Sequence, residues 1–279
     1  MSVITWTLES QHLVGSTTVT VLLPDRPREE APRDYYAAGQ EFKVVWLLHG
    51  TFGDHLDWLR RTNIDLYAAE KGVAVVMPSA LNSNYSNWPD FSLGYDMFSF
   101  VTEELMPLVH GWLPVSNRRE DNFIAGLSMG GRGTIKFATS RPELFAAAAA
   151  LSASPVEYDR VLTEDLLANG TGMFAERMRG MVANAGGLDT FLNSDENVWR
   201  SLDEKAAAGV LPRLFFACGT EDALVAPELR AFETHASQLG LDAEFWFAPG
   251  YRHEWRFWDL AIQRALEFFG LENNPSNPF

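Results

Sequence analysis

The residue of this chain best placed for nucleophilic chemistry is a serine held between two glycines. Residues 126–130 read G-L-S-M-G, so Ser128 has a glycine two positions before it and another two positions after it. This spacing is typical of a serine on a sharp turn from a strand into a helix, where side chains at the glycine positions would collide. A short apolar run at residues 123–125 precedes the motif, and residues 131–139 can form the following helix. The pattern predicts that Ser128 is a nucleophile at the positive N-terminal end of that helix.

The motif alone also fits a glycine-rich loop, so the interpretation depends on finding partners for the serine. A serine hydroxyl needs a general base, and the base needs a carboxylate that orients it. With a serine on such a turn, the acid and then the histidine follow it along the chain. Of the two histidines after Ser128, His235 falls inside a predicted helix at residues 226–239. His253 falls in the loop after the last predicted strand, residues 243–247, and is therefore the predicted base.

The orienting carboxylate should close the strand before that one. An apolar run at residues 214–218, within the strand predicted from residue 213, leads into G-T-E-D at residues 219–222. Asp222 is the predicted acid, and Glu221, one residue away, is the alternative. A purely structural alternative is that Asp222 caps the helix that begins near residue 226.

Ester hydrolysis passes through a tetrahedral oxyanion, which backbone N–H groups can stabilise. One predicted donor is the N–H of Met129, the residue after the nucleophile, and the other is the N–H of Thr51. Thr51 follows the buried strand predicted at residues 44–48, in the sequence H-G-T, where the glycine lets the backbone approach closely. We expect His49 to brace this loop rather than to do chemistry. As a metal ligand it lacks partners, because no pattern such as H-E-x-x-H is present.

Composition excludes several other classes of function. The 279 residues are 47% hydrophobic, which suits one sizeable domain spanning residues 1–279. The net charge of −15 argues against nucleic acid and anionic membranes as partners.

We expect no metal and no cofactor. Cys218 is the only cysteine, and neither a metal cluster nor a phosphate-cradling glycine motif is visible. With no signal-peptide pattern and no apolar stretch of ~18 residues, we expect a cytoplasmic protein that does not enter membranes.

Apolar strand-like runs alternate with helix-like segments along most of the chain. This alternation predicts an α/β protein with a mainly parallel sheet flanked by helices. Two β-rich segments, residues 3–10 and 16–23, are typical of an antiparallel pair at a sheet edge. Residues 152–211 break the alternation, because they contain several helical stretches and no convincing strand. We therefore predict a helical, cap-like insertion there between two strands.

Five longer stretches carry a resemblance to a known family. They read V-W-L-L-H-G-T-F-G-D-H-L-D-W-L-R-R-T-N-I, V-A-V-V-M-P-S-A, G-L-S-M-G-G, G-T-E-D-A-L and G-Y-R-H-E-W, and together span residues 45–255. The chain resembles the esterase D-like, tributyrin-esterase-type serine hydrolases, which are related to S-formylglutathione hydrolases and to feruloyl and acetylxylan esterases. The resemblance implies an α/β-hydrolase fold and an acyl-enzyme mechanism, with the triad on Ser128, Asp222 and His253. Two stretches depart from it: H-G-T differs from the S-G-L-T-C form of formylglutathione hydrolases, and residues 152–211 match poorly.

We therefore expect a serine carboxylesterase that acts on small-molecule esters with short acyl chains. The predicted lining of a narrow pocket is aromatic and consists of Tyr85, Trp88 and Phe91 from the loop at residues 78–94, flanked by Trp58 and Trp255. Four alternatives remain open: a feruloyl or acetylxylan-type esterase, a thioesterase similar to S-formylglutathione hydrolase, an acyltransferase using the same triad, and a non-catalytic binding protein of this fold. The sequence also leaves open whether the chain forms a homo-oligomer.

Overall fold

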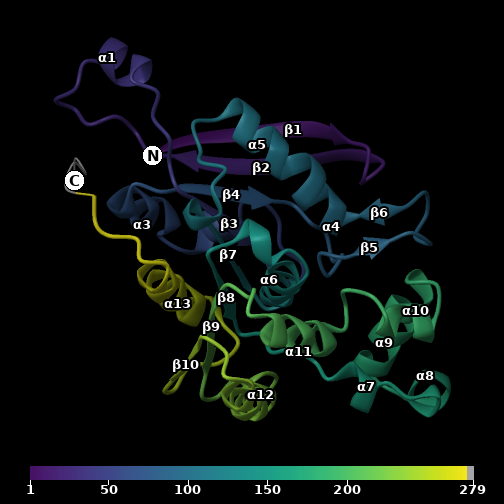
Figure 1. Ribbon diagram of the computed structural model, residues 1–279. Helices are drawn as coiled ribbons and strands as arrows, with labels where there is room; N and C mark the ends of the chain where they lie inside the picture. Colours follow the sequence, from purple (N-terminus) through teal and green to yellow (C-terminus); the bar gives the residue numbers. More distant parts are fainter. Residues whose placement is uncertain (275–279) are drawn as a thin grey trace.

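An eight-stranded sheet runs through the centre of the molecule, for which a computed structural model describes residues 1–274 (Figure 1). From edge to edge the strands are β1 (Ser2–Ser10), β2 (Gly15–Leu23), β4 (Ala74–Pro78), β3 (Val44–Leu48), β7 (Asn122–Leu127), β8 (Ala147–Leu151), β9 (Arg213–Gly219) and β10 (Ala243–Ala248). β2 pairs antiparallel with β1 and with β4, and all other neighbours pair in parallel. The predicted mainly parallel sheet and the antiparallel pair at its edge are therefore confirmed.

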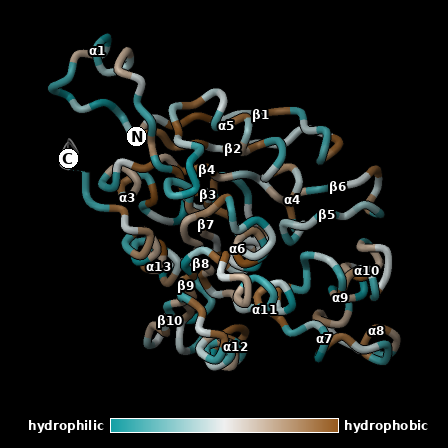
Figure 2. The backbone as a smooth tube through the Cα atoms, in the orientation of Figure 1, coloured by the Kyte–Doolittle hydropathy of each residue, from teal (hydrophilic) through white to brown (hydrophobic). Residues whose placement is uncertain are grey.

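The central strands are apolar because helices cover both faces of the sheet. Every residue of β3, β4, β7 and β8 is buried. The run of alanines in β8 leaves room for a helix to lie close to the sheet. In Figure 2 the hydrophilic colour dominates the outer loop that carries α1 (Pro32–Ala37), well away from these strands.

Two layers of helices flank the sheet (Figure 1). On one face, α3 (Ile64–Lys71) and α13 (Trp255–Phe268) bury apolar side chains against the strands. On the other face lie α5 (Met106–Trp112), α6 (Met129–Ser140) and α12 (Ala226–Leu239). Short helical segments complete the layers: α2 (Asp57–Arg61), α4 (Met97–Ser99), the π-helical turn Phe100–Leu105, and the 3-10 turns Arg119–Asp121 and Pro142–Leu144.

The segment between β8 and β9 is helical, as the sequence predicted. It contains α7 (Tyr158–Val161), α8 (Glu164–Asn169), α9 (Met173–Asn184), α10 (Leu188–Leu192) and α11 (Val198–Ala208). The first four helices project away from the sheet (Figure 1) and build a small apolar cluster of their own. α11 instead packs against α6 and α12, so it ties the insertion to the central layers.

The structure adds elements that the sequence patterns did not reveal. The loop at residues 78–94 contains strand β5 (Asn87–Trp88), which pairs antiparallel with β6 (Tyr95–Asp96). This hairpin lies beside the insertion, because Trp88 belongs to the apolar cluster of α7, α9 and α10. Among residues 1–274, no helix combines the length and the apolar character needed to cross a membrane.

Candidate active site

Ser128 stands on a sharp turn between β7 and α6. Its backbone has φ 52° and ψ −113°, a conformation that serine rarely adopts and that costs on the order of 1–3 kcal/mol. A Cβ added to Gly126 would lie 2.4 Å from the carbonyl oxygen of Gly130, and one added to Gly130 would lie 2.5 Å from the carbonyl oxygen of Leu48. Both distances are too short for a side chain, so the crowding predicted for these two glycines is confirmed.

The structure brings Ser128, His253 and Asp222 into one hydrogen-bonded row. His253 lies in the loop between β10 and α13, and its Nε2 is 2.9 Å from Ser128 Oγ. Its Nδ1 is 2.8 Å from Oδ2 of Asp222, which follows the end of β9. Asp222 is buried, and its second carboxylate oxygen accepts the N–H of Leu224 at 3.2 Å. A carboxylate held in this way accepts a hydrogen bond from Nδ1–H and leaves Nε2 of a neutral imidazole free to accept one from the serine hydroxyl.

The rival residues lie outside this row. Glu221 has a side chain that is 52% exposed, and its carboxylate pairs with Arg252 at 3.2 Å. His235, on α12, faces Asp203, with 2.8 Å between Nε2 and Oδ1. The residue that precedes the first turn of α12 is Val225, and no side chain caps this helix, so the structural alternative for Asp222 does not apply.

His49 braces the loop after β3. It is buried, its Nδ1–H donates to the carbonyl oxygen of Gly50 at 2.7 Å, and its Nε2 accepts the N–H of Ala80 at 2.9 Å. Burial lowers the pKa of this imidazole, which therefore stays neutral in the tautomer that both hydrogen bonds require. The bracing role expected for His49 agrees with these contacts.

The two predicted oxyanion donors lie on segments that border the nucleophile. Met129 is the first residue of α6, so its N–H has no partner within the helix. Thr51 follows Gly50, where an added Cβ would come within 2.5 Å of the Leu127 side chain and 3.5 Å of Ser128 Cβ. The turn that carries Thr51 is fixed by Phe52, whose φ is 66° and whose N–H donates to Asn82 Oδ1 at 2.8 Å. The H-G-T loop therefore lies directly against Ser128.

Three of the five aromatic residues predicted to line the pocket are instead packed inside the protein. Tyr85 is fully buried, and its hydroxyl donates to the carbonyl oxygen of His49 at 3.1 Å. Trp58 is 1% exposed and donates from Nε1 to the carbonyl oxygen of Leu48 at 3.0 Å. Trp88 packs against the insertion helices and is 6% exposed. These side chains offer almost no surface to a ligand, so they support loops from behind rather than form a pocket wall.

The other two predicted aromatic residues keep exposed surface. Phe91 is 49% exposed and packs edge-on against Tyr95 of the β5–β6 hairpin. Trp255 is half-buried at the start of α13, between the indoles of Trp58 and Trp258. Both side chains therefore keep surface that a ligand could contact.

Sequence reasoning missed Trp258. Its indole lies 5.1 Å from the His253 ring at an interplanar angle of 88°, and its Nε1 donates to Ser152 Oγ at 2.9 Å. Ser152 follows β8 with φ 46°. The signal that could have found Trp258 is its spacing, because an aromatic residue one turn into the helix after a catalytic loop can reach back to that loop.

The last candidates for reactive chemistry are the single cysteine and a metal-binding cluster. Cys218 is fully buried in β9, and burial raises the pKa of its thiol to about 12, so it is not a nucleophile at neutral pH. Within residues 1–274, no three side chains of His, Cys, Asp or Glu gather closely enough to hold a metal ion.

Comparisons of the sequence identify related proteins. A family model described as "Putative esterase" matches residues 10–267. The acetyl esterase of Caldicellulosiruptor saccharolyticus is 28% identical over 261 residues, which cover 93% of this chain and 94% of the relative. The S-formylglutathione hydrolase of Paracoccus denitrificans (strain Pd 1222) is 30% identical over 137 residues, which cover 42% of this chain and 48% of the relative.

Solved structures of serine hydrolases share the fold. The Staphylococcus aureus fluorophosphonate-binding serine hydrolase FphF has a TM-score of 0.77 at 29% identity, covering 96% of this chain and 98% of its own. The S. aureus S-formylglutathione hydrolase FrmB has a TM-score of 0.75 at 29% identity, with the same coverage. A ferulic acid esterase has a TM-score of 0.68 at 22% identity over 96% of this chain and 97% of its own, a likeness of fold alone. Since the family model spans most of the sequence, the chain belongs to this esterase family and is a serine ester hydrolase with an α/β-hydrolase fold.

Proposed function

We propose that the protein hydrolyses short-chain acyl esters with Ser128 as nucleophile, His253 as general base and Asp222 as the orienting carboxylate. The observation that carries this proposal is the unbroken row of hydrogen bonds from Ser128 Oγ through the imidazole of His253 to Asp222. Because Nδ1–H points at the carboxylate, a neutral imidazole can accept the serine proton only at Nε2. Sheet and insertion would act together as one domain, since α11 packs on the layer that contains α6.

Acylation begins when Ser128 Oγ forms a bond to the ester carbonyl carbon while its proton moves to His253 Nε2. The π electrons of the carbonyl move to its oxygen, and the N–H groups of Met129 and Thr51 donate to the resulting oxyanion. As the intermediate collapses, the bond to the alcohol oxygen breaks and the imidazolium returns its proton to that oxygen. Water then attacks the acyl-Ser128 carbonyl carbon while its proton moves to His253 Nε2. As this second intermediate collapses, the bond to Ser128 Oγ breaks, Oγ takes the proton back from the imidazolium, and the carboxylic acid leaves.

The preference for short acyl chains is supported by two observations. The acetyl esterase relative aligns over 93% of this chain, so the similarity includes every segment that contributes to the site. Trp255 packs against Trp258, whose indole contacts His253, so its bulky ring lies near enough to shorten an acyl pocket. We propose exposed Phe91 as a second part of the same wall. A pocket closed in this way rejects longer chains, because overpacking costs about 1–3 kcal/mol.

Thioester hydrolysis is the second candidate reaction. Its support is the likeness to FrmB, a S-formylglutathione hydrolase, at 29% identity over nearly the whole of both chains. The steps are the same, with a thiolate leaving in place of an alkoxide. The likeness to a ferulic acid esterase, at 22% identity, is one of fold alone and gives no support to a feruloyl preference.

Labelling and substrate competition test both candidates. We expect an organophosphonate to block activity at one equivalent and to leave its adduct on the peptide that contains Ser128. Competition between p-nitrophenyl acetate and S-acetylglutathione then ranks ester against thioester by kcat/KM. An added alcohol that increased product formation through transesterification would instead favour the acyltransferase alternative, and a protein inert to the phosphonate would contradict the mechanism.

A further inference from the structure

The one ion pair in residues 1–274 with both partners deeply buried joins α6 to the insertion. Lys136 lies two turns beyond Ser128 on α6, and Glu196 lies just before α11. The side chains are 3% and 6% exposed, and the ammonium and the carboxylate are in direct contact. Burial lowers the pKa of Lys136, an effect that the neighbouring carboxylate opposes. A buried pair of charges is a poor source of stability compared with apolar packing, so its position calls for another role.

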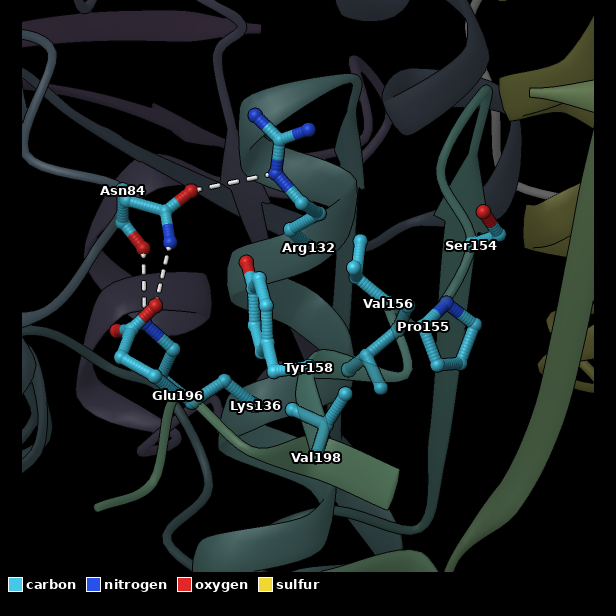
Figure 3. Close-up of a pocket in the computed structure, with 10 residues that line it drawn as sticks. Asn84, Arg132, Lys136, Ser154, Pro155, Val156, Tyr158, Glu196 and Val198 are labelled. Carbon is cyan, nitrogen blue, oxygen red and sulfur yellow. Dashed lines mark hydrogen bonds and ion pairs between the residues drawn. The ribbon is translucent and has the colours of Figure 1, made fainter. Parts of the chain in front are cut away.

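Both charges hold the same short loop, residues 83–86. Lys136 Nζ donates to the carbonyl oxygen of Asn84 at 3.1 Å and also contacts Ser86 Oγ. Glu196 accepts from the side-chain amide of Asn84 at 2.8 Å and from the Ser86 hydroxyl. Figure 3 shows Asn84 between Glu196 and Arg132, whose Nε donates to the Asn84 amide oxygen at 3.3 Å. Every polar group of the Asn84 side chain is therefore engaged.

The loop needs this hold because its backbone is strained. Asn84 has φ 57° and Tyr85 has φ 54°, so two consecutive non-glycine residues lie in the left-handed region. Asparagine tolerates that region, whereas the bulky tyrosine is a true outlier there. Such conformations persist only where surrounding contacts fix them, and they gather near functional sites.

Tyr85 connects this loop to the H-G-T loop, which carries the proposed oxyanion donor Thr51. Its hydroxyl donates to the carbonyl oxygen of His49 at 3.1 Å, and its ring lies where a side chain at Gly133 of α6 would otherwise be. The same His49 carbonyl oxygen would be only 2.6 Å from a Cβ at Gly130, so it is pressed against the start of α6. Thr51 lies two residues beyond His49 in the same loop.

We propose that Lys136 and Glu196 are positioning residues that fix the direction of the Thr51 N–H. The contacts that connect the pair to Thr51 run through Asn84, Tyr85 and His49. This inference rests on the proposed function, since it assigns a task to the same oxyanion donors. It gives the insertion a part in the reaction itself, because Glu196 belongs to residues 152–211. No hydrogen bond or ion pair joins Lys136 or Glu196 to Ser128 or His253.

The test is a kinetic comparison of Lys136→Met, Glu196→Gln and the double variant Lys136→Met/Glu196→Leu. Complete loss of an oxyanion donor lowers kcat about 10²- to 10³-fold, so a displaced donor should lower it by about 10- to 100-fold. We expect KM for p-nitrophenyl acetate to change less than about two-fold, because the ground-state ester gains little from the oxyanion donors. Affinity for a trifluoromethyl ketone, which forms an oxyanion when bound, should fall in parallel with kcat/KM.

The double variant guards against a loss of folding, because replacing both charges with apolar side chains leaves no unpaired charge. Lys205→Met, on α11 of the insertion, is the matched control, and it should retain wild-type kcat. If the folded double variant kept wild-type kcat and ketone affinity, the positioning role would be wrong. Ester hydrolysis that survived in the Ser128→Ala variant would instead contradict the proposed function, so the two failures can be told apart.

Discussion

The indole of Trp258 stands edge-on to the imidazole of His253, with ring centroids 5.1 Å apart and planes at 88°. The indole is itself fixed by the hydrogen bond from Nε1 to Ser152 Oγ. The edge of one aromatic ring is electropositive and attracts the face of another, so this contact restricts how far the imidazole can rotate. In the proposed mechanism, Trp258 keeps His253 aligned between Ser128 and Asp222.

Removing the Trp258 ring should therefore slow turnover. Aromatic pairs contribute about 0.5–1.5 kcal/mol beyond their buried area, so we expect Trp258→Leu to lower kcat about 2- to 13-fold. Trp258→Phe is the matched control, because it keeps a ring but loses the hydrogen bond to Ser152. Steady-state kinetics of both variants would separate the ring contact from the hydrogen bond to Ser152. Equal losses of kcat would assign the effect to the hydrogen bond.

Ser128→Ala should abolish ester hydrolysis while the protein stays folded. Removing the nucleophile of a serine triad costs on the order of 10⁶ in turnover. Circular dichroism and a thermal melt would establish that the variant is folded, and hydrolysis of p-nitrophenyl acetate would measure the loss. A clean preparation that retained about a tenth of the wild-type rate would rule out Ser128 as the nucleophile.

Asp222→Asn should lower kcat about 10⁴-fold, because an amide at this position no longer selects the imidazole tautomer with a proton on Nδ1. Glu221→Gln is the matched control one residue away. Its carboxylate is exposed and paired with Arg252, so its loss should leave kcat near the wild-type value. Should the two variants exchange these outcomes, the acid would be Glu221.

Conformational stability should fall as the pH decreases from about 7 to 5. Burial lowers the pKa values of His49, His55 and His110 below the ordinary 6.5. The unfolded chain then binds protons that the folded protein excludes, so the stability contribution is complete above pH 6.5 and is lost as the pH falls. A proton fully excluded by the buried His49 contributes a slope of up to about 1.4 kcal/mol per pH unit, and solvent screening makes the contribution of the more exposed His55 smaller.

Urea unfolding at several pH values would measure this slope. His49→Gln keeps a donor and an acceptor but cannot titrate, so its unfolding free energy should depend less steeply on pH. A variant slope identical to that of the wild type would show that His49 protonates equally in both states.

The specificity constant should be greatest for acyl chains of about two to four carbons. In an open apolar groove each added methylene would gain about 0.8 kcal/mol and the rate would climb. A narrow pocket should instead make the rate fall as the acyl chain lengthens. Values of kcat/KM for p-nitrophenyl acetate, butyrate and octanoate distinguish the pocket from the groove, and a maximum at octanoate would contradict the narrow pocket. Phe91→Ala tests the wall itself, because it should improve octanoate relative to acetate.

The sequence was most informative where chemistry and backbone geometry restrict the residue type. Ser128, Asp222 and His253 follow three different parallel strands, and the carboxyl ends of such strands meet at one edge of the sheet. The glycines around Ser128 were predictable for the same reason, since only glycine fits where two backbone segments touch.

Packing partners were much harder to predict. Tyr85 and Trp58 carry polar atoms and lie in or beside loops, which favoured exposed positions, yet each directs its polar atom to a buried backbone carbonyl. The left-handed φ of Tyr85 could not be predicted from its residue type, because tyrosine is not typical of turns. The Lys136–Glu196 pair joins residues 60 positions apart, and no local pattern encodes such a contact.

The backbone strain at Ser128 has a consequence for laboratory evolution. Glycine relaxes a positive φ at almost no conformational penalty, so Ser128→Gly exchanges the nucleophile for a more comfortable turn. A library selected for heat resistance alone would therefore enrich inactive sequences at this position. Screens that aim for a robust catalyst from this scaffold must score hydrolysis in the same round as thermal tolerance.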